Sequence, residues 1–266
     1  MLRTCHLFAG AGGGLLADLI LGHTPVVAVE WDAYCCQVLR ERAADEWFPG
    51  LHVHEGDVRL FDPSEYAGRV DCIHAGFPCT DVSVAGARAG LGEGTRSGLY
   101  REVLRIAGAI RPRYLFLENV AAIVPLLGTV LGDLAALGYD CRWLCLRASA
   151  VGAPHHRDRW WCLADASGRR CGGSLARQDQ QSRGAEVVGS SENVAHPNCT
   201  LRKGLFITVG AYPEYTESGG SCWWGTEPDV GRVADGVAAR FHRVKALGNG
   251  QVPLQAAAAW TLLGGP

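Results

Sequence analysis

Strand-like and helical segments alternate along the first 165 residues of the chain. The strand-like segments are short apolar runs, and the segments between them have the wider apolar spacing of amphipathic helices. Strands are expected at residues 4–8, 26–30, 51–54, 70–75, 114–118, 141–146 and 159–164, and helices at 14–21, 33–46, 99–110 and 126–137. This alternation predicts an α/β fold with a mostly parallel sheet covered on both faces. The short connection at 147–158 predicts that the last two strands form an antiparallel hairpin at one edge.

The sequence changes character near Asp165. Residues 166–240 are rich in Gly, Ser, Arg and Gln and have little strand or helix periodicity. An alanine-rich helix is expected at 251–263, after Gly248-Asn249-Gly250. We therefore expect one main domain formed by residues 1–165 and 241–266, with a small inserted region at 166–240.

Several bulk properties narrow the class of protein. No apolar run approaches the roughly 20 residues that span a bilayer, and the first residues lack a signal-peptide layout, so a cytoplasmic protein without a membrane partner is expected. The 11 cysteines form no Cys-x-x-Cys pair and are expected to be reduced thiols. His196 and Cys199, with Cys171 and Cys222, are too loosely spaced to favour zinc, and no metal site is predicted.

The basic residues are almost all arginine. Of the 25 lysines and arginines, only Lys203 and Lys245 are lysine. Arginine binds phosphates and guanine edges, although a GC-rich genome would give the same bias. The net charge of −2 does not exclude a nucleic-acid partner, because a local basic face is sufficient.

A glycine-rich turn at residues 8–14 links the first expected strand to the first helix. Glycines at such a turn allow a ligand to approach the backbone beside a helix N-terminus. Glu30 closes the next strand, 20 residues after Gly10, where an acid can bind ribose hydroxyls, and Asp57 is placed to meet an adenine amino group. These features alone fit NAD, S-adenosylmethionine or a purely structural turn.

Two further strand ends carry reactive groups. Cys79 follows the strand at 70–75 in Gly-Phe-Pro-Cys, and Glu118 closes the strand at 114–118. Parallel strands would bring both to one edge of the sheet, where a thiolate and a carboxyl group suggest attack on a heterocycle. A space-filling cysteine and a salt-bridged carboxylate are the structural alternatives. Arg157 and Arg159, at i and i+2, would share one face of a strand and could hold a carboxylate, a phosphate or a base edge.

Five motifs occur together in one order. They are Phe8-Ala-Gly-Ala-Gly-Gly, Gly76-Phe-Pro-Cys-Thr-Asp-Val-Ser, Glu118-Asn-Val, Pro154-His-His-Arg-Asp-Arg and Gly248-Asn-Gly-Gln-Val-Pro. Over residues 1–165 and about 243–266 the chain resembles the DNA (cytosine-5)-methyltransferase family. The resemblance implies a Rossmann-like S-adenosylmethionine-dependent methyltransferase fold with a mixed, mostly parallel seven-stranded sheet. It also implies that residues 166–240 are a small target-recognition region.

The resemblance also implies catalytic roles. Cys79 matches the nucleophile that adds to carbon 6 of a cytosine, and Pro78 shapes the turn that presents it. Glu118 matches the acid at ring nitrogen 3, and Arg157 with Arg159 matches the pair that supports the base and positions this carboxylate. The base must leave the duplex stack, and residues 83–95 are expected to form a loop that closes over it.

The implied cofactor is S-adenosylmethionine, with S-adenosylhomocysteine as its product. Trp31 is expected against the adenine, and Glu30 on the ribose. The matching pocket residues are Phe8, Gly10, Gly12, Glu30, Trp31, Asp57 and Leu99, with Asn249 and Val252 in the tail motif that packs against the pocket.

The chain also departs from the family pattern. His155 stands where the family usually has Gln, Gly250 where it usually has Ser, and the arginine-leading motif before the tail helix is shortened to about 233–247. The expected partner is double-stranded DNA bound by a monomer, with a cognate restriction endonuclease as a further candidate. Three alternatives stay open: a nicotinamide-dependent oxidoreductase, a non-catalytic DNA-binding relative, and an enzyme that modifies tRNA or uses another one-carbon donor.

Overall fold

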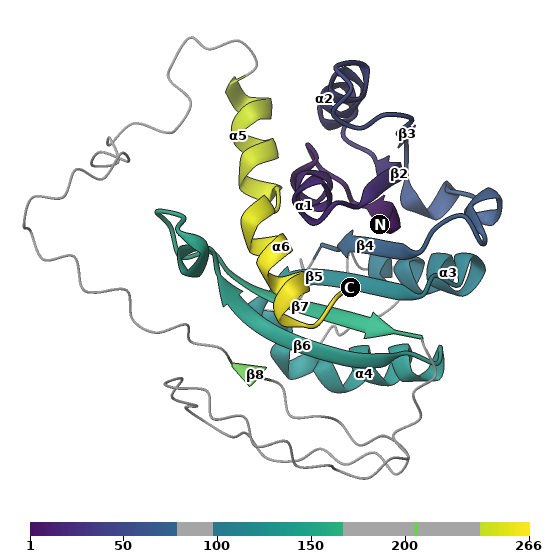
Figure 1. Cartoon of the computed structure of the whole chain (residues 1–266), viewed down its shortest axis with the longest axis vertical. Helices are drawn as coiled ribbons and strands as arrows, with labels where there is room; N and C mark the ends of the chain where they lie inside the picture. Colours follow the sequence, from purple (N-terminus) through teal and green to yellow (C-terminus); the bar gives the residue numbers. More distant parts are fainter. Residues whose placement is uncertain (79–97, 167–204, 207–239) are drawn as a thin grey trace, which may run out of the picture.

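A computed structural model describes residues 1–78, 98–166, 205–206 and 240–266 of the protein (Figure 1). Its sheet has the strand order β3-β2-β1-β4-β5-β7-β6-β8, and every strand runs parallel to its neighbours except β7, which is antiparallel to β5 and β6. The strands are β1 (Arg3–Leu7), β2 (Thr24–Glu30), β3 (His52–Glu55), β4 (Cys72–Gly76), β5 (Tyr114–Val120), β6 (Asp140–Arg147), β7 (Asp158–Asp165) and β8 (Leu205–Phe206).

The sheet confirms the expected mixed, mostly parallel α/β fold. All seven expected strands are present, and the hairpin predicted from the short connection is the β6–β7 pair. The hairpin lies at one edge as expected, with its second strand between β5 and β6 and only the two-residue β8 beyond β6. The two-residue β8 was not predicted and pairs with β6, which adds an eighth strand.

Helices cover both faces of the sheet. They are α1 (Gly13–Leu21), α2 (Ala33–Ala44), α3 (Leu99–Ile110), α4 (Leu127–Ala136), α5 (Arg240–Asn249) and α6 (Pro253–Leu262). Residues of α3 and α4 pack on one face, and those of α1 and α6 on the other (Figure 1). The tail helix begins at Pro253 instead of residue 251, because the fixed φ of proline suits the first helical position.

Two adjacent tryptophans on β7 join the layers to the sheet. Successive strand residues point to opposite faces, so Trp160 packs in the core with α3 and α4, and Trp161 in the core with α6. Trp161 stacks on Phe116 at 5.1 Å between ring centroids, and Trp260 of α6 meets the same ring edge-on at 5.3 Å. These rings fix the tail helix against the centre of the sheet.

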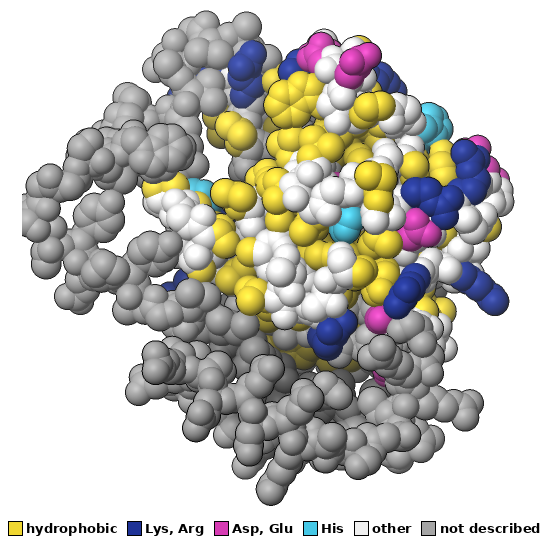
Figure 2. Space-filling model, viewed as in Figure 1, with side chains coloured by type: hydrophobic (Ala, Val, Ile, Leu, Met, Phe, Trp, Pro, Cys, Tyr) yellow, Lys and Arg dark blue, Asp and Glu magenta, His cyan; other side chains and the backbone are white. Residues whose placement is uncertain are grey.

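The surface seen in Figure 2 is mixed in character. Apolar side chains gather near its centre, and basic side chains lie mainly around its rim. Among the exposed apolar residues are Leu19 and Ile20 on α1 and Leu254 and Leu262 on α6. No helix in the described part of the chain is long and apolar enough to cross a membrane.

Candidate active site

The carboxyl ends of β4 and β5 bring two of the sequence motifs together. Gly76, the last residue of β4, lies opposite Glu118 of β5 in the parallel register. The side-chain amide of Asn119 donates a 3.0 Å hydrogen bond to the Phe77 carbonyl and so ties the segment before Pro78 to β5. Cys79 follows Pro78 directly and, with residues 83–95, lies outside the described residues.

Glu118 is a nearly buried carboxyl group with two polar partners. Its side chain is 12% exposed, and its Oε1 lies 2.9 Å from Nε of Arg159. Its Oε2 accepts a 3.3 Å hydrogen bond from Nε2 of Gln251. Burial raises the pKa of Glu118 above its ordinary value, although Arg159, Gln251 and Arg157 oppose that shift. The protonated form is therefore favoured more than in an exposed glutamate, as suits a proton donor.

Arg157 differs from its partner in the expected arginine pair. It lies one residue before β7 with a φ of 39°, so the two arginines do not share a regular strand face. Its guanidinium donates to the carbonyl of Gly248 at 2.9 Å and to that of Gly250. Arg159 pairs with Glu118, whereas Arg157 holds the tail segment beside the site.

The glycine-rich turn has an unusual backbone. Phe8, Gly10 and Gly12 all have positive φ, at 58°, 55° and 96°. A positive φ is strained for a residue with a side chain, and such strain is concentrated at functional sites. The carboxylate of Glu30 braces this turn by accepting hydrogen bonds from the backbone N–H of Gly10 at 2.7 Å and of Trp31 and Asp32 at 2.9 Å.

The other expected cofactor residues come from several elements, and of these only Asn249 lines the cleft beside this turn. Trp31 is 76% exposed, so its ring is open to a ligand. Asp57 begins a short 3-10 helix (Val58–Leu60), and Arg59 lowers its pKa by binding the carboxylate. Leu99 begins α3 and packs on the core, Asn249 ends α5, and Val252 caps α6. The acid on β2 is thus followed directly by an open aromatic ring.

A buried polar cluster beneath the turn was missed by the sequence analysis. His6 Nε2 lies 2.7 Å from Oδ2 of Asp18, which also accepts a hydrogen bond from the Thr4 hydroxyl. His23 lies 3.6 Å from the other carboxylate oxygen, and the ring of His74 lies 4.9 Å from that of His6. The sequence does contain one pattern that indicates this cluster. Thr4 and His6 are polar, stand at i and i+2 in an otherwise apolar strand, and so point to the same face of the sheet.

The same cluster contains metal-ligand atoms. His6, Asp18 and His74 each offer one atom, all within 4.8 Å of one another. Two ligands of a tetrahedral zinc ion stand about 3.3 Å apart, given zinc–nitrogen bonds of about 2.0 Å. The 2.7 Å separation of His6 and Asp18 is that of a hydrogen bond, so the arrangement is a polar network rather than a preformed metal site.

Five of the described thiols are poor candidates for a nucleophile because their pKa values are raised. Burial raises the pKa of Cys5, Cys72 and Cys162, and it raises those of Cys36 and Cys145 to about 11. For Cys162, a hydrogen bond with Cys141 is the larger cause. Thiolate character decides reactivity, so these side chains act as packing groups.

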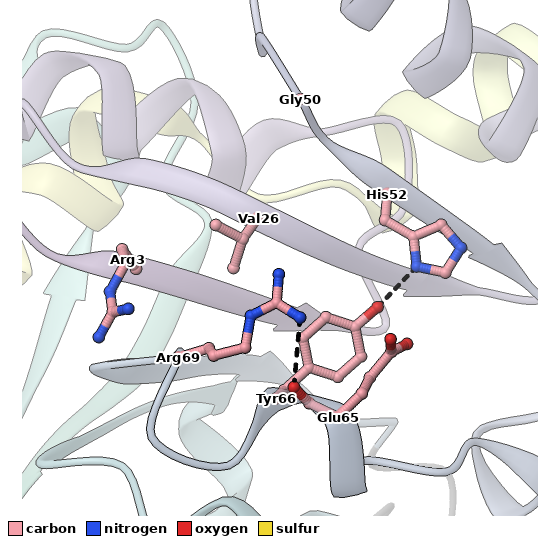
Figure 3. A pocket seen from close by; sticks show the side chains of 7 residues that line it. All are labelled: Arg3, Val26, Gly50, His52, Glu65, Tyr66 and Arg69. Carbon is pink, nitrogen blue, oxygen red and sulfur yellow. Dashed lines mark hydrogen bonds between the residues drawn. The ribbon is translucent and has the colours of Figure 1, made fainter.

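Two cavities lie at opposite ends of the parallel strands. A narrow cleft of about 30 Å³ at the carboxyl ends is lined by Phe8, Gly10, His74, Glu118 and Gln251 among others. A larger cavity of about 480 Å³ lies at the amino ends, and within it a ring nitrogen of His52 bonds the Tyr66 hydroxyl (Figure 3). Its other lining residues are Arg3, Val26, Gly50, Glu65 and Arg69. The reactive Glu118 and the glycine-rich turn lie at the smaller cleft.

Known proteins share both the sequence and the fold. Type II methyltransferase M.CviJI of Paramecium bursaria Chlorella virus IL3A is 38% identical over 165 residues, covering 61% of this chain and 42% of that protein. Type II methyltransferase M.Eco47II of Escherichia coli is 38% identical over 160 residues, covering 58% and 37%. The chain thus spans less than half the length of these relatives. A mutant DNMT2 of Spodoptera frugiperda shares the fold, with a TM-score of 0.52, 20% identity, and coverage of 68% of this chain and 54% of that one.

The family model provides the broadest match. The model for C-5 cytosine-specific DNA methylase matches residues 2–191, most of the chain and all strands from β1 to β7. The match includes the glycine-rich turn, the Pro-Cys segment, Glu118 and both arginines of the site. The chain belongs to the C-5 cytosine-specific DNA methylase family.

Proposed function

We propose that this chain is a DNA (cytosine-5)-methyltransferase that methylates a flipped-out cytosine in a short duplex site. The observation that carries the proposal is the placement of Glu118. It lies opposite Gly76, three residues before Cys79, and it is nearly buried and paired with Arg159. A carboxyl group with a raised pKa beside the strand that leads to a cysteine is suited to activating a heterocycle.

In the proposed mechanism the thiolate of Cys79 adds to carbon 6 of the cytosine. Glu118 delivers its proton to ring nitrogen 3, which stabilises the charge that develops on the ring, and Arg159 keeps the carboxyl group in place. Carbon 5 thereby becomes nucleophilic. When bound, S-adenosylmethionine would supply the methyl group for carbon 5 and would leave as S-adenosylhomocysteine. A water molecule then takes the proton from carbon 5, and Cys79 leaves carbon 6 as a thiolate. The proton on nitrogen 3 returns to Glu118, which restores the aromatic ring and the enzyme.

The proposed cofactor site is the strained turn with its brace. Glu30 accepts three backbone hydrogen bonds, and a carboxylate has about four acceptor positions, so one is left for a ribose hydroxyl. The exposed ring of Trp31 can stack on the adenine, and Asp57 follows the next strand. Phe8, Gly10, Gly12, Leu99, Asn249 and Val252 complete the proposed pocket.

The proposed substrate is double-stranded DNA, and residues 166–240 are the proposed recognition region. Their number, small for such a region, favours a short site or few base contacts. The relatives are named type II methyltransferases, which supports a cognate restriction endonuclease as a partner in the cell. We propose that the chain acts as a monomer, because one copy contains every motif of the proposed chemistry.

Expression in a methylation-deficient bacterial host, followed by bisulfite sequencing of its DNA, tests this proposal. Protected cytosines at one short sequence are expected with the wild-type chain and none with Cys79→Ser. Parallel assays of the purified chain with radiolabelled methyl donor on duplex DNA and on transfer RNA identify the nucleic acid. Label in the RNA alone, or in neither, would reject DNA methylation.

A further inference from the structure

Gln251 fills a space that three glycines leave open. A Cβ atom at Gly14 would lie 2.8 Å from Oε1 of Gln251, and one at Gly76 would lie 2.9 Å from Nε2. A Cβ atom at Gly13 would collide with the backbone carbonyl of Gln251. Real Cβ contacts essentially never fall below 3.0 Å. The backbone and side chain of Gln251 therefore occupy the space beside the start of α1 and the end of β4.

Both ends of the Gln251 amide have partners. Its Nε2 donates to Oε2 of Glu118 at 3.3 Å. Its Oε1 and the Cε1 atom of the His74 ring both lie beside Gly14, where a Cβ atom would be 2.8 Å from the first and 2.9 Å from the second. A hydrogen bond to Gln251 acts to raise the pKa of His74, but burial outweighs it and lowers that pKa to about 3. The His74 ring is therefore neutral at working pH and carries a single N–H.

The position of that N–H follows from the surroundings of the ring. Nε2 of His74 is buried and has no hydrogen-bond partner among the described residues, which leaves Nδ1 as the ring nitrogen that can donate to Gln251. A donor at Oε1 leaves the amide only one orientation, with its N–H group toward Glu118. His6 lies against the same imidazole at 4.9 Å, and Asp18 acts on it electrostatically.

We propose that Gln251 is a positioning residue that orients the Glu118 carboxyl group for proton transfer, and that His74 fixes the direction of the Gln251 amide. This inference rests on the proposed methyl transfer and adds a second support opposite Arg159. Arg159 holds Oε1 and Gln251 holds Oε2, so the carboxyl group is fixed on both sides. No sequence motif assigned a role to Gln251 or His74.

The proposal has a definite consequence for pH dependence. The groups that face Glu118 are Arg159, Arg157 and Gln251, and each favours its ionised form. Without the amide donor the pKa of Glu118 rises further. Glu118 must be protonated to act, so the rate falls as pH rises through this pKa. Loss of Gln251 should therefore move the falling limb of the pH–rate profile to higher pH. It should also lower the maximal rate, because the carboxyl group loses the hydrogen bond that fixes its Oε2 atom.

The test uses Gln251→Met, which keeps the length of the side chain and removes its polar atoms, and Gln251→Leu as a second variant. The readout is the single-turnover rate of adduct formation with duplex DNA that contains 5-fluorocytosine, measured across pH. We expect the maximal rate to be about tenfold lower and the midpoint of the falling limb of the pH–rate profile to lie about one pH unit higher. Affinity for S-adenosylhomocysteine should change less than about twofold. His74→Phe should shift the limb in the same direction.

A double-variant cycle separates positioning from general structure. If Gln251 acts through Glu118, adding Gln251→Met to Glu118→Gln should cost little further rate. Gln37→Met is the matched control, because Gln37 donates a 2.9 Å hydrogen bond to Glu41 on the exposed surface of α2. It should match the wild-type rate and pH profile.

A folded Gln251→Met variant with the wild-type rate and pH profile would overturn the inference. The inference would also be overturned if Gln251→Met lowered the rate as much in the Glu118→Gln variant as it does in the wild-type chain. If the wild-type chain forms no adduct and transfers no methyl group, the proposed function fails instead. A carboxyl-carbon NMR titration of Glu118 in both chains then decides the inference, which requires a higher pKa in Gln251→Met and is rejected by equal values.

Discussion

The carboxylates of Glu30, Asp57 and Glu118 have different hydrogen-bond partners. Glu30 is bound by three backbone N–H groups, Asp57 by Arg59, and Glu118 by Arg159 and Gln251. Arg59 lowers the pKa of Asp57, whereas burial raises the pKa of Glu118 and so favours its protonated form. One sheet edge thus offers acceptors suited to a cofactor and a proton donor suited to a base.

Replacing Glu30 with alanine tests the cofactor site. The variant loses the proposed ribose contact and the brace on the glycine-rich turn. Binding of S-adenosylhomocysteine should weaken by roughly 1.5–3 kcal/mol, as expected for a lost hydrogen bond to a charged group. Isothermal titration calorimetry measures this, with Glu41→Ala on the exposed face of α2 as control. Unchanged affinity would remove Glu30 from the site.

The identities of the site residues could be predicted from sequence more readily than their contacts. Glu118 and Arg159 form the expected pair, because strand ends and motif order define their edge. Arg157 binds backbone carbonyls of the tail instead, a contact between residues about 90 positions apart that no local pattern encodes. The partnership of Gln251 with Glu118 was missed for the same reason.

At the level of the elements, apolar periodicity determined which segments were found. The buried strands and α3, with its buried Tyr100, Val103 and Ile106, gave clear patterns. The helix α5 was missed because none of its residues is buried, and it is held by polar contacts such as that of Lys245 with Asp32 at 2.6 Å. The two-residue β8 is too short for any periodic signal.

Helix α1 is attached to β1 through the buried carboxylate of Asp18. Burial acts to raise the pKa of Asp18, but His6 and His23 outweigh it and hold that pKa well below its usual range. Asp18→Asn leaves these partners uncompensated and should cost about 3 kcal/mol of unfolding free energy, measured by urea denaturation. Asp45→Asn, at an exposed pair with Arg42, should cost less than about 1 kcal/mol.

The same variant has a predictable pH dependence. A carboxyl group with a depressed folded pKa stabilises the fold above its unfolded pKa of about 3.9 and loses this contribution as pH falls through the folded value. The stability difference between wild type and Asp18→Asn should therefore be full at neutral pH and shrink below about pH 4. A pH-independent difference would show that packing, not charge, accounts for the effect.

Considered as a whole, the molecule is proposed to separate chemistry from recognition. The described sheet and helices contain the proposed cofactor residues, Glu118 and the arginines, whereas residues 166–240 are assigned to recognition. Replacing 170–200 and 210–235 with the corresponding region of a relative should change the methylated sequence. Binding of S-adenosylhomocysteine should stay within about twofold of wild type. The same methylated site after the exchange would assign recognition to the main domain.

Formation of a covalent complex through Cys79 tests the proposed chemistry most directly. A base with fluorine at carbon 5 cannot lose a proton there, so the enzyme should remain attached to it. Incubating the chain with S-adenosylmethionine and duplex DNA that contains 5-fluorocytosine should give a denaturant-resistant complex that peptide mapping places at Cys79. Cys79→Ser should form none, since a hydroxyl is a far poorer nucleophile. A complex that persists in Cys79→Ser, or maps to Cys72 or Cys141, would contradict the account.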